Sequence, residues 1–245
     1  MSGDPAGEVL ATLATYDDFI SQLEVIADMG SGDGRYSNML ATMELEDGTP
    51  LMPTVMAVDD KIQMDNRYRT KNIRQIRQDF SDTSIQEGKV DMIWCHDAFQ
   101  FAHDPWKTLR HWHKILRPSG MLLMSVPQTA FIDDLSRWQV YQQPSCYHSW
   151  NMVNLIQVLA TCGFDCREGF LRQRRHDPLL WAAVYKSDTP PMDPATTTWY
   201  DLMDAKLLPL SAEQFVLKTG FLRLDAMVLQ WLDRNNYDLA VEMMP

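Results

Sequence analysis

The segment Glu-Val-Ile-Ala-Asp-Met-Gly-Ser-Gly-Asp-Gly, residues 24–34, decides the fold. A short β-branched run, Val25-Ile26, leads to Asp28, and three glycines follow at alternate positions. Glycine allows a tight turn and a close approach of backbone to ligand, because it has no Cβ. The next stretch, 35–42, reads as a helix. Strand, glycine turn and helix together predict the phosphate- or nucleoside-binding corner of a doubly wound α/β sheet.

The spacing of the glycines distinguishes between ligands. A dinucleotide fingerprint, Gly-x-Gly-x-x-Gly, requires a third glycine at the position of Arg35, which disfavours a nicotinamide-dependent oxidoreductase. An acid two residues before the first of three alternating glycines instead resembles motif I of the class I S-adenosylmethionine-dependent methyltransferases. The resemblance implies that the cofactor is S-adenosylmethionine, the product is S-adenosylhomocysteine, and the cofactor is bound by Asp28, Gly30, Ser31 and Gly32.

Acids also follow the next two predicted strands. The buried run 55–58 ends in Asp59-Asp60, where a carboxylate can accept both ribose hydroxyls of a nucleoside. The run 73–78 is closed by Asp79-Phe80. In the family an acid at that place accepts from the adenine amino group and a neighbouring apolar side chain packs against the ring. Asp82 lies close enough to compete for the adenine role.

The segment 90–127 extends the resemblance. It contains a strand, a loop, the phrase HDPWKTLRHWHKILRPSG and a second strand that ends in Pro127. Asp104 and Pro105 are ordinary helix-start residues, as cap and first-turn proline. The succession is similar to the small class I methyltransferases of the type 11 family over about residues 20–186. That family often has Glu-His after the fourth strand, where this chain has Gln100-Phe101, so the resemblance leaves the acceptor open.

The remaining segments complete the predicted organisation. A helix over 152–162 precedes two strands, 164–171 and 180–185, joined by a turn as an antiparallel hairpin. The resemblance implies an α/β, Rossmann-like, seven-stranded, mostly parallel sheet with an antiparallel last strand and helices on both faces. We expect a methyltransferase domain over 1–186, with an N-terminal helical segment, 1–23, and a substrate lid region, 129–150.

Residues 187–245 form a predicted linker and C-terminal helical extension. The stretch 187–198 is rich in proline, serine and threonine, which is typical of a linker or extended arm. Ser211, three residues before Gln214, fits a capping box ahead of amphipathic helices at 212–219 and 221–235. Their apolar faces pack either on the core or against a second subunit, as in a homodimer.

Residues for catalysis are less strongly indicated. His96 and Asp97 follow the fourth strand, at the edge where α/β sites open, and His148 precedes the sixth helix. Each is a candidate base, but a structural role is the alternative for all three. Cys95 is a candidate neighbour of the cofactor. The resemblance implies that the lid lines the acceptor pocket, and its aromatic residues either do so or pack helices: Phe131, Trp138, Tyr141 and Tyr147.

The amino-acid composition argues against several classes of partner: nucleic acid, metal ions and membranes. The net charge of −11, from 33 acidic and 22 basic residues, argues against a nucleic-acid groove as the main working surface, and the basic stretch 67–77 reads as solvated surface. The four cysteines form no Cys-x-x-Cys pair, so we expect neither a metal site nor a disulfide framework. No signal peptide or membrane-length apolar run is visible, which favours a cytoplasmic protein with no membrane contact.

The leading hypothesis is therefore a methyltransferase that transfers the methyl group to a small-molecule acceptor by in-line displacement. Methylation of RNA or protein is the alternative within the same chemistry. A non-catalytic cofactor-binding or scaffold protein with the same fold is the alternative from another class, kept open by Gln100-Phe101.

Overall fold

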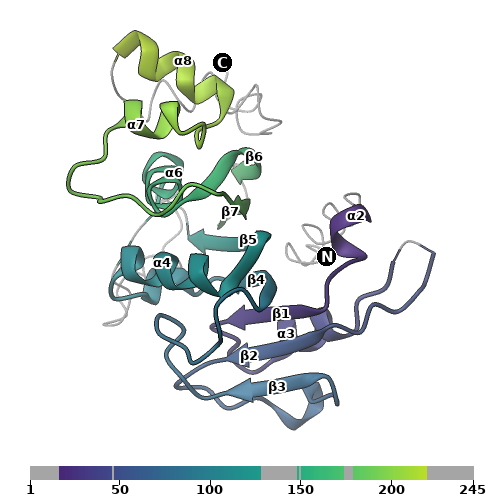
Figure 1. Cartoon of the computed structure of the whole chain (residues 1–245). Coiled ribbons are helices and arrows are strands. Elements are labelled where there is room, and N and C mark those ends of the chain that lie inside the picture. Colours follow the sequence, from purple (N-terminus) through teal and green to yellow (C-terminus); the bar gives the residue numbers. More distant parts are fainter. Residues whose placement is uncertain (1–16, 46, 128–147, 149, 174–178, 220–245) are drawn as a thin grey trace, which may run out of the picture.

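A single β-sheet forms the centre of the fold (Figure 1). The computed structural model describes residues 17–45, 47–127, 148, 150–173 and 179–219, and its seven strands form one sheet in the order β3-β2-β1-β4-β5-β7-β6. The strands are β1 (Val25–Met29), β2 (Thr54–Val58), β3 (Ile73–Ile76), β4 (Val90–His96), β5 (Leu116–Pro127), β6 (Phe164–Gln173) and β7 (Leu179–Lys186).

Strand directions confirm the predicted fold class. The pairs β3–β2, β2–β1, β1–β4 and β4–β5 are parallel, whereas β7 runs antiparallel to both of its neighbours, β5 and β6. The predicted β6–β7 hairpin is thus present, while its turn, 174–178, lies outside the described residues. Because β1 to β5 are parallel, their carboxyl ends meet at one edge of the sheet, where ligands bind in such folds.

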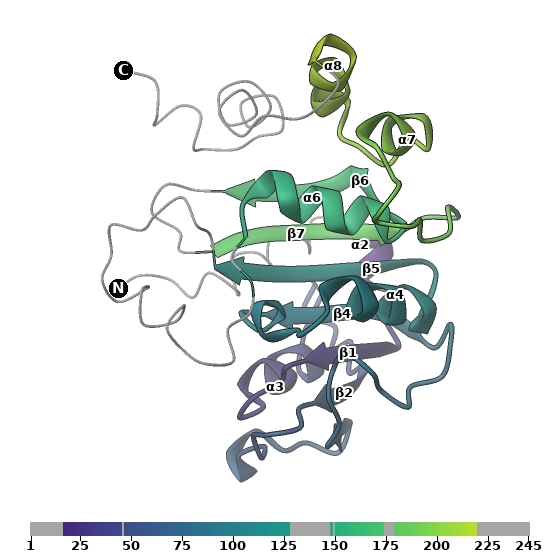
Figure 2. The ribbon, with the colours of Figure 1, turned by 90° about the vertical axis from the view of Figure 1, so that its left-hand side faces the viewer.

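Helices cover both faces of the sheet (Figure 2). One face packs against α4 (Pro105–Ile115) and α6 (Met152–Thr161), and the other against α3 (Arg35–Ala41) and the short α2 (Asp17–Ile20). α2 is the described part of the predicted segment 1–23, of which residues 1–16 lie outside the described part of the chain.

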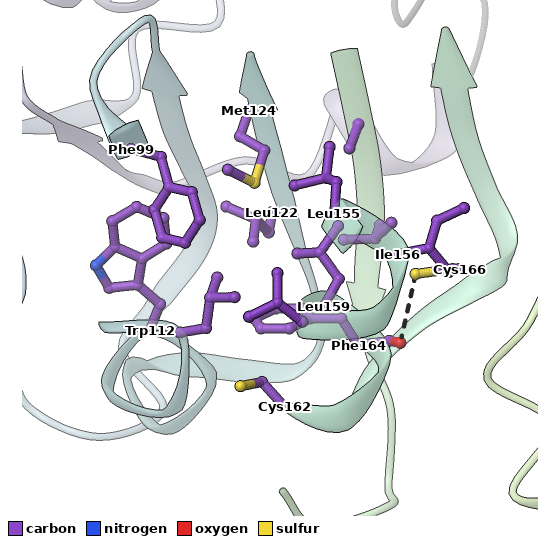
Figure 3. Close-up of a cluster of buried hydrophobic side chains, with 14 of the residues drawn as sticks. Phe99, Trp112, Leu122, Met124, Leu155, Ile156, Leu159, Cys162, Phe164 and Cys166 are labelled. Atoms are coloured by element: carbon purple, nitrogen blue, oxygen red, sulfur yellow. Dashed lines mark hydrogen bonds between the residues drawn. The ribbon is translucent and has the colours of Figure 1, made fainter. Parts of the chain in front are cut away.

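The larger core lies between α4, α6 and the sheet (Figure 3). Trp112 of α4, Leu155 of α6 and Phe164 of β6 are all completely buried there. Burying one such side chain stabilises the fold by about 1.5–3 kcal/mol. This core gives the carboxyl ends of β4 and β5 a rigid support.

Side chains set the starts of α4 and α6. The Asp104 carboxylate accepts a hydrogen bond from the Lys107 backbone N–H at 2.9 Å, and Pro105 opens α4 as the sequence predicts. Asn151 and Asn154 form a reciprocal capping box at the start of α6.

The C-terminal part differs from the prediction in two places. An additional helix, α7 (Trp199–Asp204), begins at a capping box between Thr198 and Asp201. α8 (Leu210–Thr219) begins one residue before Ser211, so the predicted cap at Ser211 is wrong. The reason is that the Pro209 carbonyl accepts the first helical hydrogen bonds and takes the cap position.

The described C-terminal helices pack on the domain core. Val216 of α8 is completely buried, and Arg167 of β6 pairs with Glu213 of α8 at 3.1 Å. The predicted linker is also attached, because the Met192 N–H donates to the Thr161 carbonyl at 2.8 Å. The predicted helix 221–235 lies outside the described residues.

The β2–β3 end of the sheet carries little helix. Between these strands the structure has one short 3-10 turn, η1 (Asn66–Tyr68), which Asp65 caps.

No helix in the described part of the chain is long and apolar enough to cross a membrane.

Candidate active site

The glycine loop after β1 is locked to its neighbours by backbone contacts. The N–H groups of Gly30 and Ser31 both donate to the Val58 carbonyl of β2, at 2.9 and 3.0 Å. Gly30 has a φ of +79°, and a Cβ added there would lie 2.4 Å from the Cβ of Ala98. Only glycine therefore fits this position, between the ends of β1 and β2 and the loop that follows β4.

Gly32 lies in a different environment. Its φ is +55°, and an added Cβ would meet no atom within 4 Å. The Gly32 N–H donates to Asp59 Oδ2 at 3.0 Å. The loop thus presents open backbone beside a carboxylate, which is the cradle that a nucleoside cofactor requires.

Asp59 joins the loops that follow β1 and β2. In addition to Gly32, its carboxylate accepts from the N–H groups of Lys61 at 2.9 Å and Ile62 at 2.8 Å. These three backbone donors fix the carboxylate at the tip of β2 while the residue stays partly exposed. Asp60 is exposed next to it. Asp59 therefore lies where the resemblance requires a ribose carboxylate.

Asp28 is buried below the glycine loop. The Ser37 hydroxyl of α3 donates to its Oδ2 at 2.5 Å. Burial raises the pKa of Asp28 to about 7; the Ser37 hydrogen bond opposes this change and the charge of Asp59 adds to it. Near neutral pH the carboxyl group is therefore close to its midpoint of ionisation, and a positively charged ligand group would favour the ionised form.

The loop after β3 forms the other wall. The Phe80 ring lies 3.9 Å from the position of an added Cβ at Gly30. The indole N–H of Trp112 donates to the Phe80 carbonyl at 2.8 Å and anchors the loop to α4. Asp79 is exposed, and its carboxylate accepts from the Ser81 N–H.

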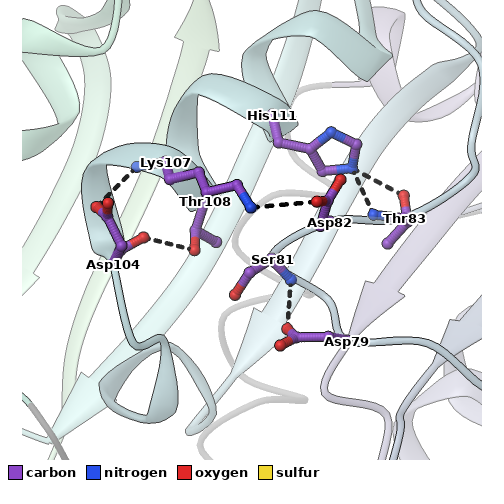
Figure 4. A network of polar contacts seen from close by, with 8 residues as sticks. All are labelled: Asp79, Ser81, Asp82, Thr83, Asp104, Lys107, Thr108 and His111. Carbon is purple, nitrogen blue, oxygen red and sulfur yellow. Dashed lines mark hydrogen bonds and ion pairs between the residues drawn. The ribbon is translucent and has the colours of Figure 1, made fainter.

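Asp82 is engaged by α4 in an ion pair (Figure 4). The Lys107 ammonium lies 3.1 Å from Asp82 Oδ2, and His111 Nε2 accepts from the Thr83 N–H at 3.0 Å. These contacts leave Asp79 as the carboxylate next to Phe80. They also hold the loop on the C-terminal side of the predicted adenine contacts, Asp79 and Phe80.

His96 lies in an aromatic cluster at the end of β4. Its ring is stacked on Trp181 with centroids 5.2 Å apart and meets the edge of Tyr36 at 4.5 Å. His96 Nδ1 lies 2.7 Å from the hydroxyl oxygen of Ser125, which also accepts from the Asp97 N–H at 3.0 Å. The buried Ser125 thus fixes the ring orientation of His96.

Three members of this cluster were not predicted from the sequence. Tyr36 is the second residue of α3, next to the glycine loop, and an aromatic residue there is a usable signal. Ser125 is the one hydroxyl side chain in the apolar run 121–127. Trp181 had no signal, because only the antiparallel β5–β7 pairing brings it opposite Ser125.

Asp97 adopts a left-handed backbone conformation, with a φ of +50°. Its carboxylate accepts from Gln100 Nε2 at 2.9 Å, and burial raises its pKa. Gln100 is itself buried within the 3-10 turn η2 (Phe99–Phe101). Gln100 therefore braces the loop beside His96, which gives the departure from the family's Glu-His pair a structural role.

The other predicted site residues lie elsewhere. The thiol of Cys95 is completely buried in the core, so only its backbone is near the edge of the sheet. The His148 backbone N–H donates to the Gln100 carbonyl at 3.3 Å, and His148 Nε2 lies 3.4 Å from the His103 carbonyl oxygen. The four aromatic candidates of the lid lie outside the described residues: Phe131, Trp138, Tyr141 and Tyr147.

Comparison with protein families identifies the domain. A model described as a methyltransferase domain matches residues 27–124, from β1 through most of β5. Residues 27–124 form a class I methyltransferase domain. The protein therefore contains an S-adenosylmethionine-dependent methyltransferase domain, as the sequence motifs predict. A comparison with proteins of curated function finds no match.

Solved structures share the fold of this methyltransferase. A chain from the complex between the Haloferax volcanii Trm112 methyltransferase activator and a putative methyltransferase is 16% identical, with a TM-score of 0.55 over 72% of this chain and 90% of that chain. A putative sarcosine dimethylglycine methyltransferase from Galdieria sulphuraria is 15% identical, with a TM-score of 0.54 over 75% of this chain and 86% of that chain.

A third structure contains ligands. The Burkholderia thailandensis 1,6-didemethyltoxoflavin-N1-methyltransferase with bound 1,6-didemethyltoxoflavin and S-adenosylhomocysteine is 19% identical, with a TM-score of 0.51 over 73% of this chain and 76% of that chain. At these identities the likeness concerns the fold.

Proposed function

We propose that this methyltransferase methylates a small molecule bound at the carboxyl ends of β4 and β5, beside His96. The observation that carries the proposal is the aromatic cluster around that side chain. Tyr36 links the cluster to the glycine loop, so the cofactor and an acceptor would meet next to His96. Two of the structures with the same fold have names that refer to small-molecule acceptors, which is consistent with this proposal.

Each wall of the glycine-loop site receives one part of the cofactor in this proposal. The glycine loop, with Gly30, Ser31 and the open backbone of Gly32, takes the amino-acid end together with Asp28. Asp59 takes the ribose hydroxyls, with Asp60 at the rim. Asp79 and Phe80 take the adenine.

S-adenosylmethionine supplies an activated methyl group on a positively charged sulfur. The protein then has to align the acceptor in line with that methyl group and exclude water. A base is required only where the acceptor must lose a proton. His96, oriented through Nδ1 by Ser125, is the candidate that the described residues offer, and Asp97 braces the same loop.

Purified protein with methyl-labelled S-adenosylmethionine tests the acceptor class. Label should enter a low-molecular-weight metabolite extract, and variants with His96→Ala or Ser125→Ala should slow transfer about 10–100-fold while they bind S-adenosylhomocysteine normally. The exposed His103→Ala is the control and should transfer at the normal rate. Label in total RNA or in a protein extract, with none in metabolites, would contradict a small-molecule acceptor.

A further inference from the structure

The stretch 67–77 concentrates positive charge in an acidic protein. It holds five of the 22 lysines and arginines of the chain, and no acidic residue occurs between Asp65 and Asp79, although the net charge of the chain is −11. We call these five residues the basic edge: Arg67, Arg69, Lys71, Arg74 and Arg77. Like charges at this density repel one another, so the cluster favours a negatively charged partner.

The charges of the basic edge are largely uncompensated. All five side chains are exposed. Among the described residues, only Arg67 forms an ion pair, with Asp65 at 2.7 Å. The other ion pairs in the described part of the chain involve Lys107, Arg117 and Arg167, which lie outside the basic edge. The remaining four cations face solvent at the same end of the sheet.

The basic edge lies on a strand that has an unpaired side. β3 is the outermost strand of the sheet and pairs with β2 alone in the described residues (Figure 1). The carbonyls of Asn72 and Ile76 accept from the N–H groups of Val55 and Asp59, at 2.9 and 3.1 Å. Backbone groups of a strand alternate between its two sides, so the N–H and C=O of Gln75 face outward.

The unpaired strand edge and the positive charge together favour an acidic polypeptide as the partner. An unpaired strand edge offers main-chain hydrogen bonds to another extended polypeptide, which a nucleic acid does not use. The positive charge repels the same edge of a second copy and attracts acidic side chains. Because the β2–β3 connection contains only η1, no long helix of that connection covers the edge.

We propose that the outer edge of β3 binds an acidic polypeptide segment as an added strand. Alternating acidic side chains of the segment would face the basic edge, and its backbone would pair with the outward groups of Gln75. This surface is independent of the acceptor proposed above, and its test does not depend on methyl transfer.

Fluorescence anisotropy with a labelled peptide, Glu-Val repeated four times, tests the charge requirement. The double variant with Arg74→Gln and Arg77→Gln should bind about 10-fold more weakly than the wild type. The matched control, with Lys89→Gln and Lys206→Gln, makes the same change of charge at exposed residues away from β3 and should bind within about twofold of the wild type. Equal losses in the two double variants would contradict a specific surface.

The strand requirement has its own test. Gln75→Pro removes the outward N–H while leaving the charges and the β2 side of β3 intact, so it should weaken peptide binding about 10-fold. A peptide N-methylated at alternate backbone nitrogens makes the same test from the ligand side and does not depend on the folding of a variant. Binding that survives both changes would contradict strand addition. Tighter binding of a 20-nucleotide oligothymidylate than of the peptide would contradict it in favour of nucleic acid.

Discussion

The two halves of the sheet's carboxyl edge are built by different kinds of contact. At the ends of β1 and β2, backbone groups do the positioning, with Gly30 and Ser31 bound to the Val58 carbonyl. At the end of β4, side chains from distant parts of the chain do it, as in the contact of His96 with Ser125. The comparison teaches that the half proposed for the cofactor is positioned mainly through backbone groups, whereas the half proposed for the acceptor is positioned through contacts between side chains. The predictions below test that division.

The largest effect is expected at Gly30. A methyl group added by Gly30→Ala would lie 2.4 Å from the Cβ of Ala98, at a φ of +79°. We expect the free energy of unfolding to fall by about 3 kcal/mol, from overpacking and backbone strain together. Urea denaturation measures this. Gly48→Ala is the matched control, with a φ of +80° and open space around it, and should lose about 1 kcal/mol. Equal losses in the two variants would show that Ala98 does not constrain the loop.

A substitution at Gly32 should lower the affinity for the cofactor with little effect on the stability of the fold. Gly32→Ala also enters open space, so its stability should match that of Gly48→Ala, with a loss of about 1 kcal/mol. Its affinity for S-adenosylhomocysteine should nevertheless fall about 10-fold or more, because the new methyl group would occupy the surface that the cofactor approaches. Titration calorimetry compares the two variants. Normal affinity in Gly32→Ala would place the cofactor away from this loop.

Asp28 predicts a pH dependence of stability. Burial raises its folded-state pKa to about 7, well above the usual value of an aspartate side chain. Between about pH 4 and pH 7 the unfolded chain therefore loses this proton while the folded protein keeps it. The contribution of Asp28 to the free energy of unfolding falls as the pH rises through this range and is constant above it.

Urea denaturation of the wild type and Asp28→Asn from pH 4 to pH 8 tests this dependence. The stability of the wild type relative to the variant should decrease with rising pH. Groups common to both proteins cancel, including His113, whose pKa burial lowers to about 4. A difference that does not change with pH would mean that Asp28 titrates normally.

The smallest effect concerns the surface of α4. The Lys107 and Asp82 side chains are 62% and 69% exposed, so Lys107→Ala should change the free energy of unfolding by less than about 0.5 kcal/mol. Trp112→Phe removes the buried hydrogen bond to the Phe80 carbonyl and should cost about 1 kcal/mol, measured in the same way. A larger loss of stability in Lys107→Ala than in Trp112→Phe would show that the ion pair, rather than the indole hydrogen bond, anchors this loop.

The cofactor half could be predicted from the sequence because its determinants are local. The turn at Gly30 and Gly32 and the acid at the tip of β2 are encoded within a few residues of their strands. The acceptor half could not be predicted in the same way. Trp181 reaches His96 only through a strand pairing set by the whole sheet, and the buried thiol of Cys95 follows from its register in β4. The missed helix α7 had a local signal, Thr198 and Asp201, at capping-box spacing.

Titration calorimetry with S-adenosylhomocysteine on the wild type, Asp59→Asn and Asp60→Asn tests the central claim most directly. Asp59 is held by three backbone N–H groups at the glycine loop, whereas its neighbour Asp60 is exposed. The account predicts binding by the wild type, a loss of about 10-fold or more in Asp59→Asn, and nearly normal affinity in Asp60→Asn. Absence of binding by folded wild-type protein, or equal affinities in the two variants, would contradict it.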